Sequence, residues 1–199
     1  MRQLLLNTGP IATLSSHNVE TPLTGEDMSD KESLCLEGGQ GILVSEGTIQ
    51  TISQSQELLH EYGKEEDSNL RVYDCKGKAI IPGFVDCHTH LVWGGDRANE
   101  MQLRHSGLTY TDIAEKGGGI QKTVDFTRSM PSAILVQLAE KRIFRALNFG
   151  TTTIECKSGY GLSVDSELKL LEINQTLGQN TPMDVHSTWL GAHDAPKDQ

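Results

Sequence analysis

The second half of this chain repeats one order of elements, a short apolar strand followed by an amphipathic helix. Apolar and β-branched runs alternate with stretches in which apolar residues recur at helical spacing. The predicted strands lie at 79–86, 151–156 and 183–190, and the predicted helices at 129–149 and 164–177. Alternation of this kind is typical of parallel βαβ units, so we predict an α/β fold with a parallel sheet.

End signals fix where the two helices should begin and stop. Ser129 is suited to the N-cap of the first helix, Pro131 to its first turn and Gly150 to the position after its end. The second helix should close at Gly178, with Leu168 among its inward-facing residues.

The first 79 residues have a different character, β-rich and irregular. Residues 41–52 hold two apolar runs around Gly47, which predicts a hairpin, while 19–33 and 61–69 should be polar connections. We therefore expect two parts, a β-rich N-terminal segment at 1–79 and an α/β region at 80–199.

Charge and cysteine usage narrow the class of protein. The net charge is −10, from 17 basic against 27 acidic residues, and the basic residues do not cluster, which argues against nucleic-acid binding. No apolar run approaches the roughly 20 residues of a membrane span. The four cysteines are far apart, which favours free thiols and a cytoplasmic location.

Two histidines stand at the end of the first predicted strand, in the run Asp86-Cys-His-Thr-His90. Side chains alternate faces along a strand, so His88 and His90 should point the same way. Paired imidazoles are a natural half of a metal site and suit Zn or Fe. Two surface histidines remain the alternative interpretation.

Polar groups also follow the other two predicted strands. Residues 157–161, with Tyr160, come after the second strand, and Gly191-Ala-His193 after the third. Barrel enzymes place their chemistry at this end of their strands. Each cluster has a plainer explanation, in which the glycines serve a turn and His193 is solvated, and Arg97 on its own is best explained as a surface ion pair.

Several runs resemble a known group of enzymes. Residues 81–90, Ile-Pro-Gly-Phe-Val-Asp-Cys-His-Thr-His, resemble the first barrel strand of the amidohydrolase superfamily. The segments 91–97, 109–113 with 117–120, 155–162 and 190–193 are similar to the imidazolonepropionase family in particular. The resemblance implies a (β/α)8 barrel of the TIM type, preceded by a β-rich segment that forms part of a composite β-sandwich domain.

The same resemblance implies an activity and the residues that serve it. The reaction would be hydrolysis of 4-imidazolone-5-propanoate to N-formimino-L-glutamate in histidine degradation, with water activated by one Zn or Fe ion. His88 and His90 would be metal ligands. Arg97, Tyr160 and His193 would bind the small anionic substrate, with Tyr110 assisting. We expect the full-length enzyme to be a homodimer without nucleic-acid or membrane partners.

The chain departs from this family in length. A barrel takes about 250 residues, whereas 80–199 supplies room for about three of eight strands. The family's third histidine ligand, its aspartate ligand and its acidic proton shuttle would lie outside this sequence, so no catalytic proton shuttle is assigned here. We expect the chain alone to be inactive or nearly so.

Two alternatives remain from the sequence. One is another amidohydrolase, such as a deaminase of a cyclic amidine. The other is a non-catalytic truncated product. Arg97 discriminates between the two enzymes, because a guanidinium suits an anionic substrate tail and serves little purpose for a neutral base.

Overall fold

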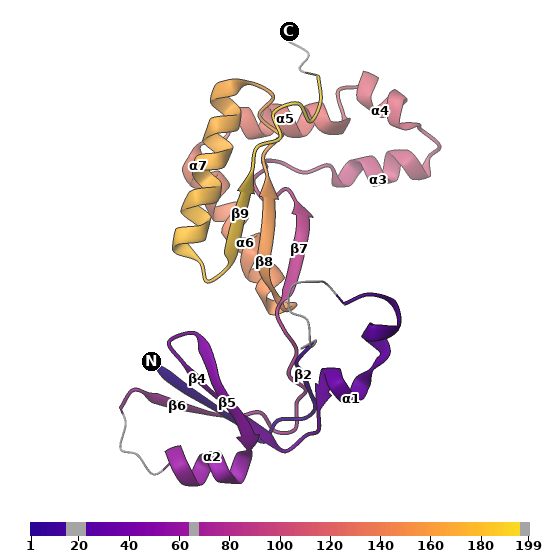
Figure 1. Cartoon of the computed structure of the whole chain (residues 1–199). Coiled ribbons are helices and arrows are strands. Elements are labelled where there is room, and N and C mark those ends of the chain that lie inside the picture. Colours follow the sequence, from indigo (N-terminus) through magenta and orange to yellow (C-terminus); the bar gives the residue numbers. More distant parts are fainter. Residues whose placement is uncertain (15–22, 64–67, 196–199) are drawn as a thin grey trace. The chain divides into compact units, whose positions relative to one another are not determined.

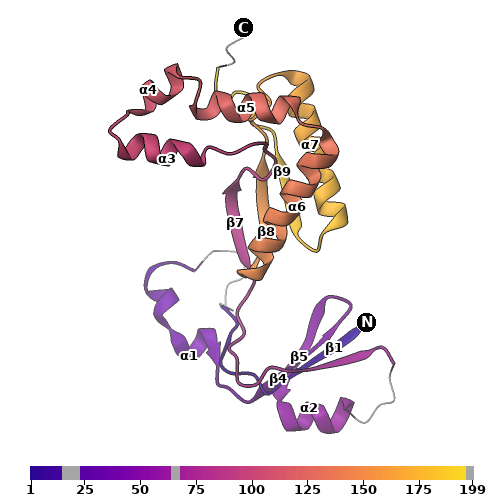
Figure 2. The same cartoon turned by 180° about the vertical axis from the view of Figure 1, so that it is seen from behind.

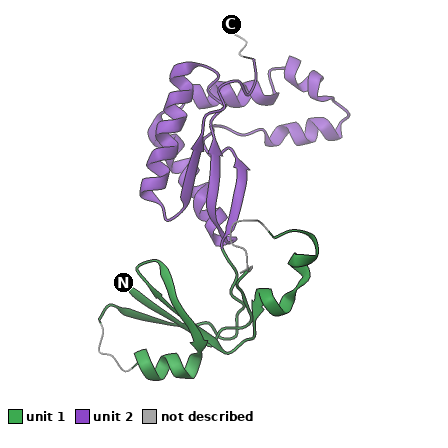
Figure 3. Ribbon diagram, viewed as in Figure 1, with its two compact units in different colours: residues 1–82 green, residues 83–199 purple. Residues whose placement is uncertain are grey.

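A computed structural model describes residues 1–14, 23–63 and 68–195. The chain divides into two compact units, 1–82 and 83–199, shown in different colours in Figure 3. In the described part of the chain, no helix has the length and apolar character needed to cross a bilayer.

The first unit is built around a four-stranded sheet in the order β5-β4-β1-β6. Its strands are β1 (Arg2–Leu6), β4 (Gln40–Ser45), β5 (Thr48–Gln54) and β6 (Leu70–Asp74). Strands β4 and β5 form the predicted hairpin, and its turn places Glu46 at φ 52° and Gly47 at φ 78°. Glycine tolerates such a φ without steric cost, which confirms the role predicted for Gly47.

Short elements complete this unit. The remaining ones are β2 (Ile11–Ala12), β3 (Cys35–Leu36), a 3-10 helix η1 (Gly25–Ser29), α1 (Lys31–Leu34) and α2 (Ser55–Tyr62). Leu58 of α2 is buried against β1 and β4 in a small core. The predicted loop at 19–33 is therefore partly wrong, because η1 and α1 occupy its described half, whereas 15–22 lie outside the described residues. The connection at 61–69 begins later than predicted, since α2 reaches Tyr62, and 64–67 also lie outside.

The second unit holds the parallel sheet that the alternation predicts. Its order is β7-β8-β9, from β7 (Phe84–Thr89), β8 (Thr151–Lys157) and β9 (Asp184–Thr188). Both pairings are parallel. The two long helices, α6 (Ser132–Asn148) and α7 (Val164–Asn180), lie on one side of this sheet in both views of Figures 1 and 2. The βαβ prediction is confirmed.

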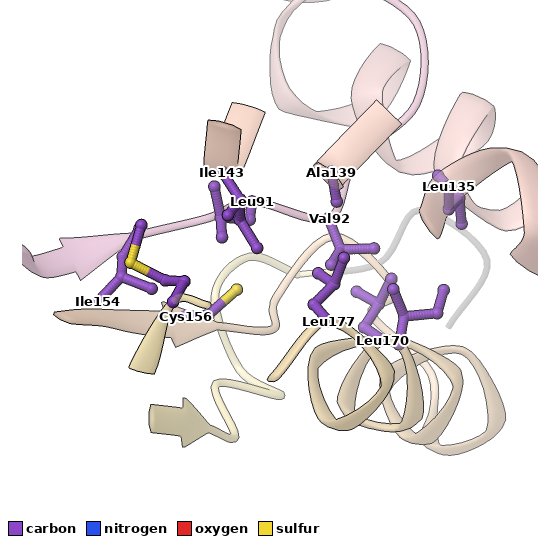
Figure 4. Packing of buried hydrophobic residues seen from close by; sticks show 11 residues of the cluster. Leu91, Val92, Leu135, Ala139, Ile143, Ile154, Cys156, Leu170 and Leu177 are labelled. Carbon is purple, nitrogen blue, oxygen red and sulfur yellow. The ribbon is translucent and has the colours of Figure 1, made fainter. Parts of the chain in front are cut away.

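The core of the second unit lies between the sheet and these helices. Ile154 and Cys156 alternate along β8 and point into it, both at most 1% exposed. Figure 4 shows the side chains that meet them; those from α6, α7 and the chain after β7 are Leu135, Ala139, Ile143, Leu170, Leu177, Leu91 and Val92. One face of the sheet is thus covered and the other, which carries Glu155 and Lys157, is left open.

Three further helices between β7 and α6 were not predicted from the sequence. They are α3 (Ala98–His105), α4 (Tyr110–Glu115) and α5 (Gly119–Ser129). Thr109 and Asp112 form a reciprocal capping box at the start of α4. The buried Glu100 carboxylate accepts a hydrogen bond from the Gly119 N–H at 2.8 Å, which satisfies a free donor at the start of α5.

Several predicted boundaries are wrong. The first strand spans Phe84–Thr89 instead of the predicted 79–86. It begins later because Pro82 has no N–H to donate to a neighbouring strand. It also ends later, so His88 lies within the strand and not after it. Ser129 ends α5, and Pro131 takes the N-cap position of α6. Gly178 lies inside α7, which continues to Asn180. Leu168 is 52% exposed, not inward-facing.

Candidate functional site

The polar groups singled out from the sequence follow three parallel strands. His88 lies in β7 and His90 directly after it, Tyr160 follows β8, and His193 follows β9. Because the strands are parallel, their carboxyl ends share one edge of the sheet, as the arrowheads in Figure 1 show. This edge is where open α/β sheets and barrels place their ligand sites.

A bulge in β7 determines which way its histidines face. The pairing of β7 with β8 shifts between Asp86 and Thr89, so that Thr89 pairs with the core residue Cys156. The Thr89 hydroxyl also donates to the Glu155 carbonyl oxygen at 2.7 Å. With Thr89 on the side of the helices, His88 and His90 face the open side of the sheet.

Four rings meet on this side, and we call His88, His90, Tyr160 and His193 the ring cluster. The His90 ring centre lies 4.7 Å from that of His193, 4.9 Å from that of Tyr160 and 6.0 Å from that of His88. The centres of Tyr160 and His193 are 5.6 Å apart. Residues about a hundred positions apart in the sequence are thereby in contact.

The environment of His90 favours its neutral form. Burial lowers the pKa of this imidazole below its usual value, and the nearby His193 and His88 rings lower it further. Its Nδ1 atom is buried and no group within the described residues hydrogen-bonds to it. A neutral imidazole with a free ring nitrogen is the form that ligates a metal ion.

The loop that carries Tyr160 is fixed by a buried carboxylate that the sequence did not single out. Glu167, in the first turn of α7, is 2% exposed. It accepts hydrogen bonds at 2.7 Å from the N–H groups of Gly159, Gly161 and Leu162. An acidic residue soon after a glycine-rich turn was the only signal available.

Ser158 joins the ends of β8 and β9 and so helps to place His193. Its N–H donates to the Thr188 carbonyl oxygen at 2.9 Å, and its hydroxyl accepts from the Leu190 N–H at 2.9 Å. Gly159 has φ 118°, and a Cβ there would lie 2.9 Å from the Cβ of His193. Only glycine allows the loop to approach the histidine this closely.

A polar group lies on the open face beside the ring cluster. Glu155 accepts hydrogen bonds from the Lys157 amino group at 2.6 Å and from the Thr188 hydroxyl at 2.8 Å. These contacts, first of all the one with Lys157, hold the pKa of the Glu155 carboxyl below its usual value, and His88 adds to the effect. A negative charge therefore lies near the histidines at neutral pH.

Within the described residues, neither Arg97 nor Tyr110 makes a hydrogen bond, ion pair or ring contact with the ring cluster. Arg97 is exposed at the N-cap of α3, with its guanidinium 4.0 Å from the Glu100 carboxylate. Tyr110 is 52% exposed at the start of α4, and no ring contact joins it to the cluster in the part of the chain that is described. The structure thus brings together four of the six residues expected at the site.

The spacing of His88 and His90 is close to that of two ligands of one ion. A ligating imidazole nitrogen lies about 2.1 Å from zinc, so the ring centres of two tetrahedral ligands lie about 5 Å apart. The observed 6.0 Å is slightly wider. Over 1–14, 23–63 and 68–195, no group of three or more His, Cys, Asp or Glu side chains is arranged to hold a metal ion. These residues fit as two ligands of a larger set.

Comparison with known proteins identifies sequence relatives of this chain. The chain is 40% identical over 193 residues to the imidazolonepropionase of Symbiobacterium thermophilum, covering 97% of the chain and 43% of the relative. It is 50% identical over 130 residues to that of Hahella chejuensis, covering 65% and 32%. The chain therefore spans less than half the length of these curated relatives. No family model matches it.

Solved structures show the same fold at lower identity. A triazine hydrolase variant superposes with TM-score 0.66 at 15% identity, over 94% of this chain and 35% of that one. Atrazine chlorohydrolase from Arthrobacter aurescens, solved with zinc, gives TM-score 0.56 at 14% identity, over 94% and 35%. By sequence, this chain is a homologue of curated imidazolonepropionases over nearly its whole length.

Proposed function

We propose that the chain is the part of an imidazolonepropionase that carries two metal ligands and most of one wall of the substrate site. The complete enzyme would hydrolyse 4-imidazolone-5-propanoate to N-formimino-L-glutamate. The observation that carries this proposal is the ring cluster at the carboxyl edge of three parallel strands, in a chain 40% identical to an imidazolonepropionase over nearly its whole length.

We also propose the fold of the complete enzyme. Residues 80–199 would be the first three strands of a (β/α)8 barrel, with the open face of β7-β8-β9 turned to the barrel interior. Support comes from the helices on the other face and from the polar residues Glu155 and Lys157 on the open one. Residues 1–79 would contribute their sheet to a composite β-sandwich domain.

One metal ion, zinc or iron, would be held by His88 and His90 together with ligands beyond this sequence. The neutral state of His90 and its free ring nitrogen support this assignment. Such an ion supplies Lewis-acid chemistry, lowering the pKa of a water molecule and polarising the ring carbonyl of the substrate.

The residues of this chain would bind and orient the substrate. Tyr160 and His193 lie against His90, so a substrate held by them would present its ring carbonyl beside the metal ligands. The Arg97 guanidinium would pair with the propionate carboxylate in exchange for part of its contact with Glu100. Tyr110 would assist. The ring nitrogen that leaves needs a proton, and we place its donor outside this sequence.

A chimera tests the proposal. We would join this chain to the remaining portion of the Symbiobacterium thermophilum relative and assay both the chimera and the chain alone with zinc and with iron. Loss of imidazolone absorbance is expected only from the metal-loaded chimera. A folded, metal-loaded chimera that leaves this substrate intact, or robust turnover by the chain alone, would contradict the proposal.

Arg97 separates the proposed reaction from the rival deamination of a cyclic amidine. In the chimera, Arg97→Met should raise KM for the propionate substrate by about tenfold or more, as expected for a charged contact to a carboxylate. Exposed Arg104→Met, in the same helix α3, is the matched control. An unchanged KM together with activity on a neutral amidine would favour the rival.

Location and assembly are proposals of the same kind. We place the complete enzyme in the cytoplasm and expect it to be a homodimer with no nucleic-acid or membrane partner. The four cysteines are free thiols, which suits a reducing compartment. Native mass spectrometry of the chimera measures the oligomeric state directly.

A further inference from the structure

We propose that Glu167 is the positioning residue of this site: it fixes the loop at 158–162 and thereby sets the place of Tyr160 in the ring cluster. Glu167 touches no substrate in this proposal and acts through the backbone of the loop. Its effect on Tyr160 stands on geometry alone. Its effect on substrate binding rests on the proposed function.

Three backbone donors converge on the one carboxylate. Gly161 and Leu162 both donate to its Oε1, and Gly159 donates to its Oε2, each at 2.7 Å. The three N–H groups are buried with it, so without Glu167 they would lack partners in the interior, at a cost in free energy for each. The loop is therefore tied at three points on both sides of Tyr160.

The loop needs such an anchor because its backbone is unfavourable. Gly159 has φ 118°, and Leu162 has φ 52°, which is costly for a residue with a branched side chain. A Cβ on Gly161 would lie 2.7 Å from the Glu167 nitrogen, so the loop lies directly against the start of α7. A conformation of this kind persists only where its surroundings enforce it.

A carboxylate is required and an amide is not an adequate replacement. A carboxylate offers acceptor oxygens only, which match the three donors. Glutamine offers one oxygen and one NH2 group, so at least one loop N–H would face another donor. The start of a helix also favours a negative charge over a neutral group. Glu167→Gln should therefore release one side of the loop while leaving the volume of the side chain unchanged.

The test observes Tyr160 itself. The chain has four tyrosines, so 3-fluorotyrosine labelling gives four 19F NMR signals, which Tyr→Phe variants assign. Glu167→Gln should shift and broaden the Tyr160 signal and leave those of Tyr62 and Tyr73 in place. The control is Asn174→Ala, which removes a buried amide from the same helix, 1% exposed, whose partners are Cys156 and Ser187.

The control separates positioning from general loss of stability. Asn174→Ala should lower the urea midpoint without moving the Tyr160 signal. An unmoved Tyr160 signal in folded Glu167→Gln, or an equal displacement in Asn174→Ala, would overturn the proposal. If Glu167→Gln does not fold, Glu167→Asp keeps the charge but shortens the reach, and the same displacement of Tyr160 is expected.

A kinetic measurement links the position to the activity. In the chimera, Glu167→Gln should raise KM by about tenfold or more while kcat changes less, because misplacing a contact group weakens binding. A chimera without turnover refutes the proposed function, and the NMR result still decides the role of Glu167. An active chimera whose KM is unchanged by Glu167→Gln would overturn the proposed effect of Glu167 on substrate binding.

Discussion

Arg142 should be one of the largest single contributors to the stability of the second unit outside its apolar core. From α6 its guanidinium donates to the carbonyl oxygens of Leu91 and Trp93, at 2.6 and 3.0 Å. It also lies 3.6 Å from the centre of the Trp93 ring. Burial lowers the pKa of this guanidinium, yet arginine stays charged at any usable pH. One side chain thus holds the segment that leads from His90 to Arg97.

The magnitude follows from these contacts. Hydrogen bonds to a charged group contribute about 1.5 kcal/mol each at the low end of their range. We use the low end because the site is half-buried, so water can replace part of the loss. The cation–π contact adds about 0.5 to 1 kcal/mol. Arg142→Met, which keeps the length of the apolar stem, should therefore cost about 3.5 to 4 kcal/mol. Arg142→Lys should cost about half as much, because a single ammonium cannot bridge both carbonyls as a fork.

Urea unfolding followed by tryptophan fluorescence measures the change in unfolding free energy of the second unit, in which Arg142 lies. The chain has two tryptophans, Trp93 and Trp189, and both lie in the second unit. With a slope of about 2 kcal/mol per M, a loss of about 3.5 to 4 kcal/mol lowers the midpoint by about 1.8 to 2 M. Arg145→Met, an exposed position on the same helix, is the control and should stay within about 0.5 kcal/mol of the unmodified chain. An Arg142→Met midpoint equal to that of the control would refute the reasoning.

Three further outcomes are expected. Burial raises the pKa of the Cys156 thiol to about 11. Iodoacetamide at pH 8 should therefore label the exposed Cys35 and Cys87 and spare Cys156. Peptide mass spectrometry measures the labelling, and equal labelling of the three would contradict the prediction. The pKa of His90 is lower in the folded chain than its unfolded value of about 6.5, so the unfolded state binds the proton first as pH falls. The free energy of unfolding, measured in EDTA, should therefore fall as pH drops through 6.5. His90→Gln should flatten this dependence of unfolding free energy on pH, and an unchanged dependence would show another cause. Gly159→Ala should lower the free energy of unfolding by about 1–3 kcal/mol and shift the His193 NMR signals. Gly178→Ala should instead raise the free energy of unfolding by up to about 1 kcal/mol. Gly178 lies inside α7, and a Cβ there would meet only the Val185 Cβ, at 3.6 Å.

The repeated pattern of the second unit was readable from the sequence because each of its elements has a strong local signal. Strand β8 alternates buried and open side chains, α6 is 17 residues long with an apolar stripe, and Gly150, at φ 91°, follows the end of α6 as predicted. Helices α3, α4 and α5 were missed since they are short and mostly polar, and the start of α5 is satisfied by a distant partner, Glu100.

The proximity of four side chains could be predicted from the sequence, whereas their roles stay predictions. His88, His90, Tyr160 and His193 were expected to lie close together because residues at the carboxyl ends of parallel strands meet at one edge. Glu167 and Arg142 could not be found, because an acidic residue in a first turn and a basic residue on a helix are ordinary features. Their importance depends on backbone groups that come near only in the folded chain.

The order of the three parallel strands also has a consequence for how the ring cluster comes together in time. Asp86 pairs with Ile154, and Ile154 pairs with Val185, so the segment joining β7 to β8 is roughly twice as long as the one joining β8 to β9. Each doubling of a loop adds about 0.6 kcal/mol to the entropy of closing it. We therefore expect β8, α7 and β9 to associate first, bringing Tyr160 to His193, and the strand with His88 and His90 to dock last.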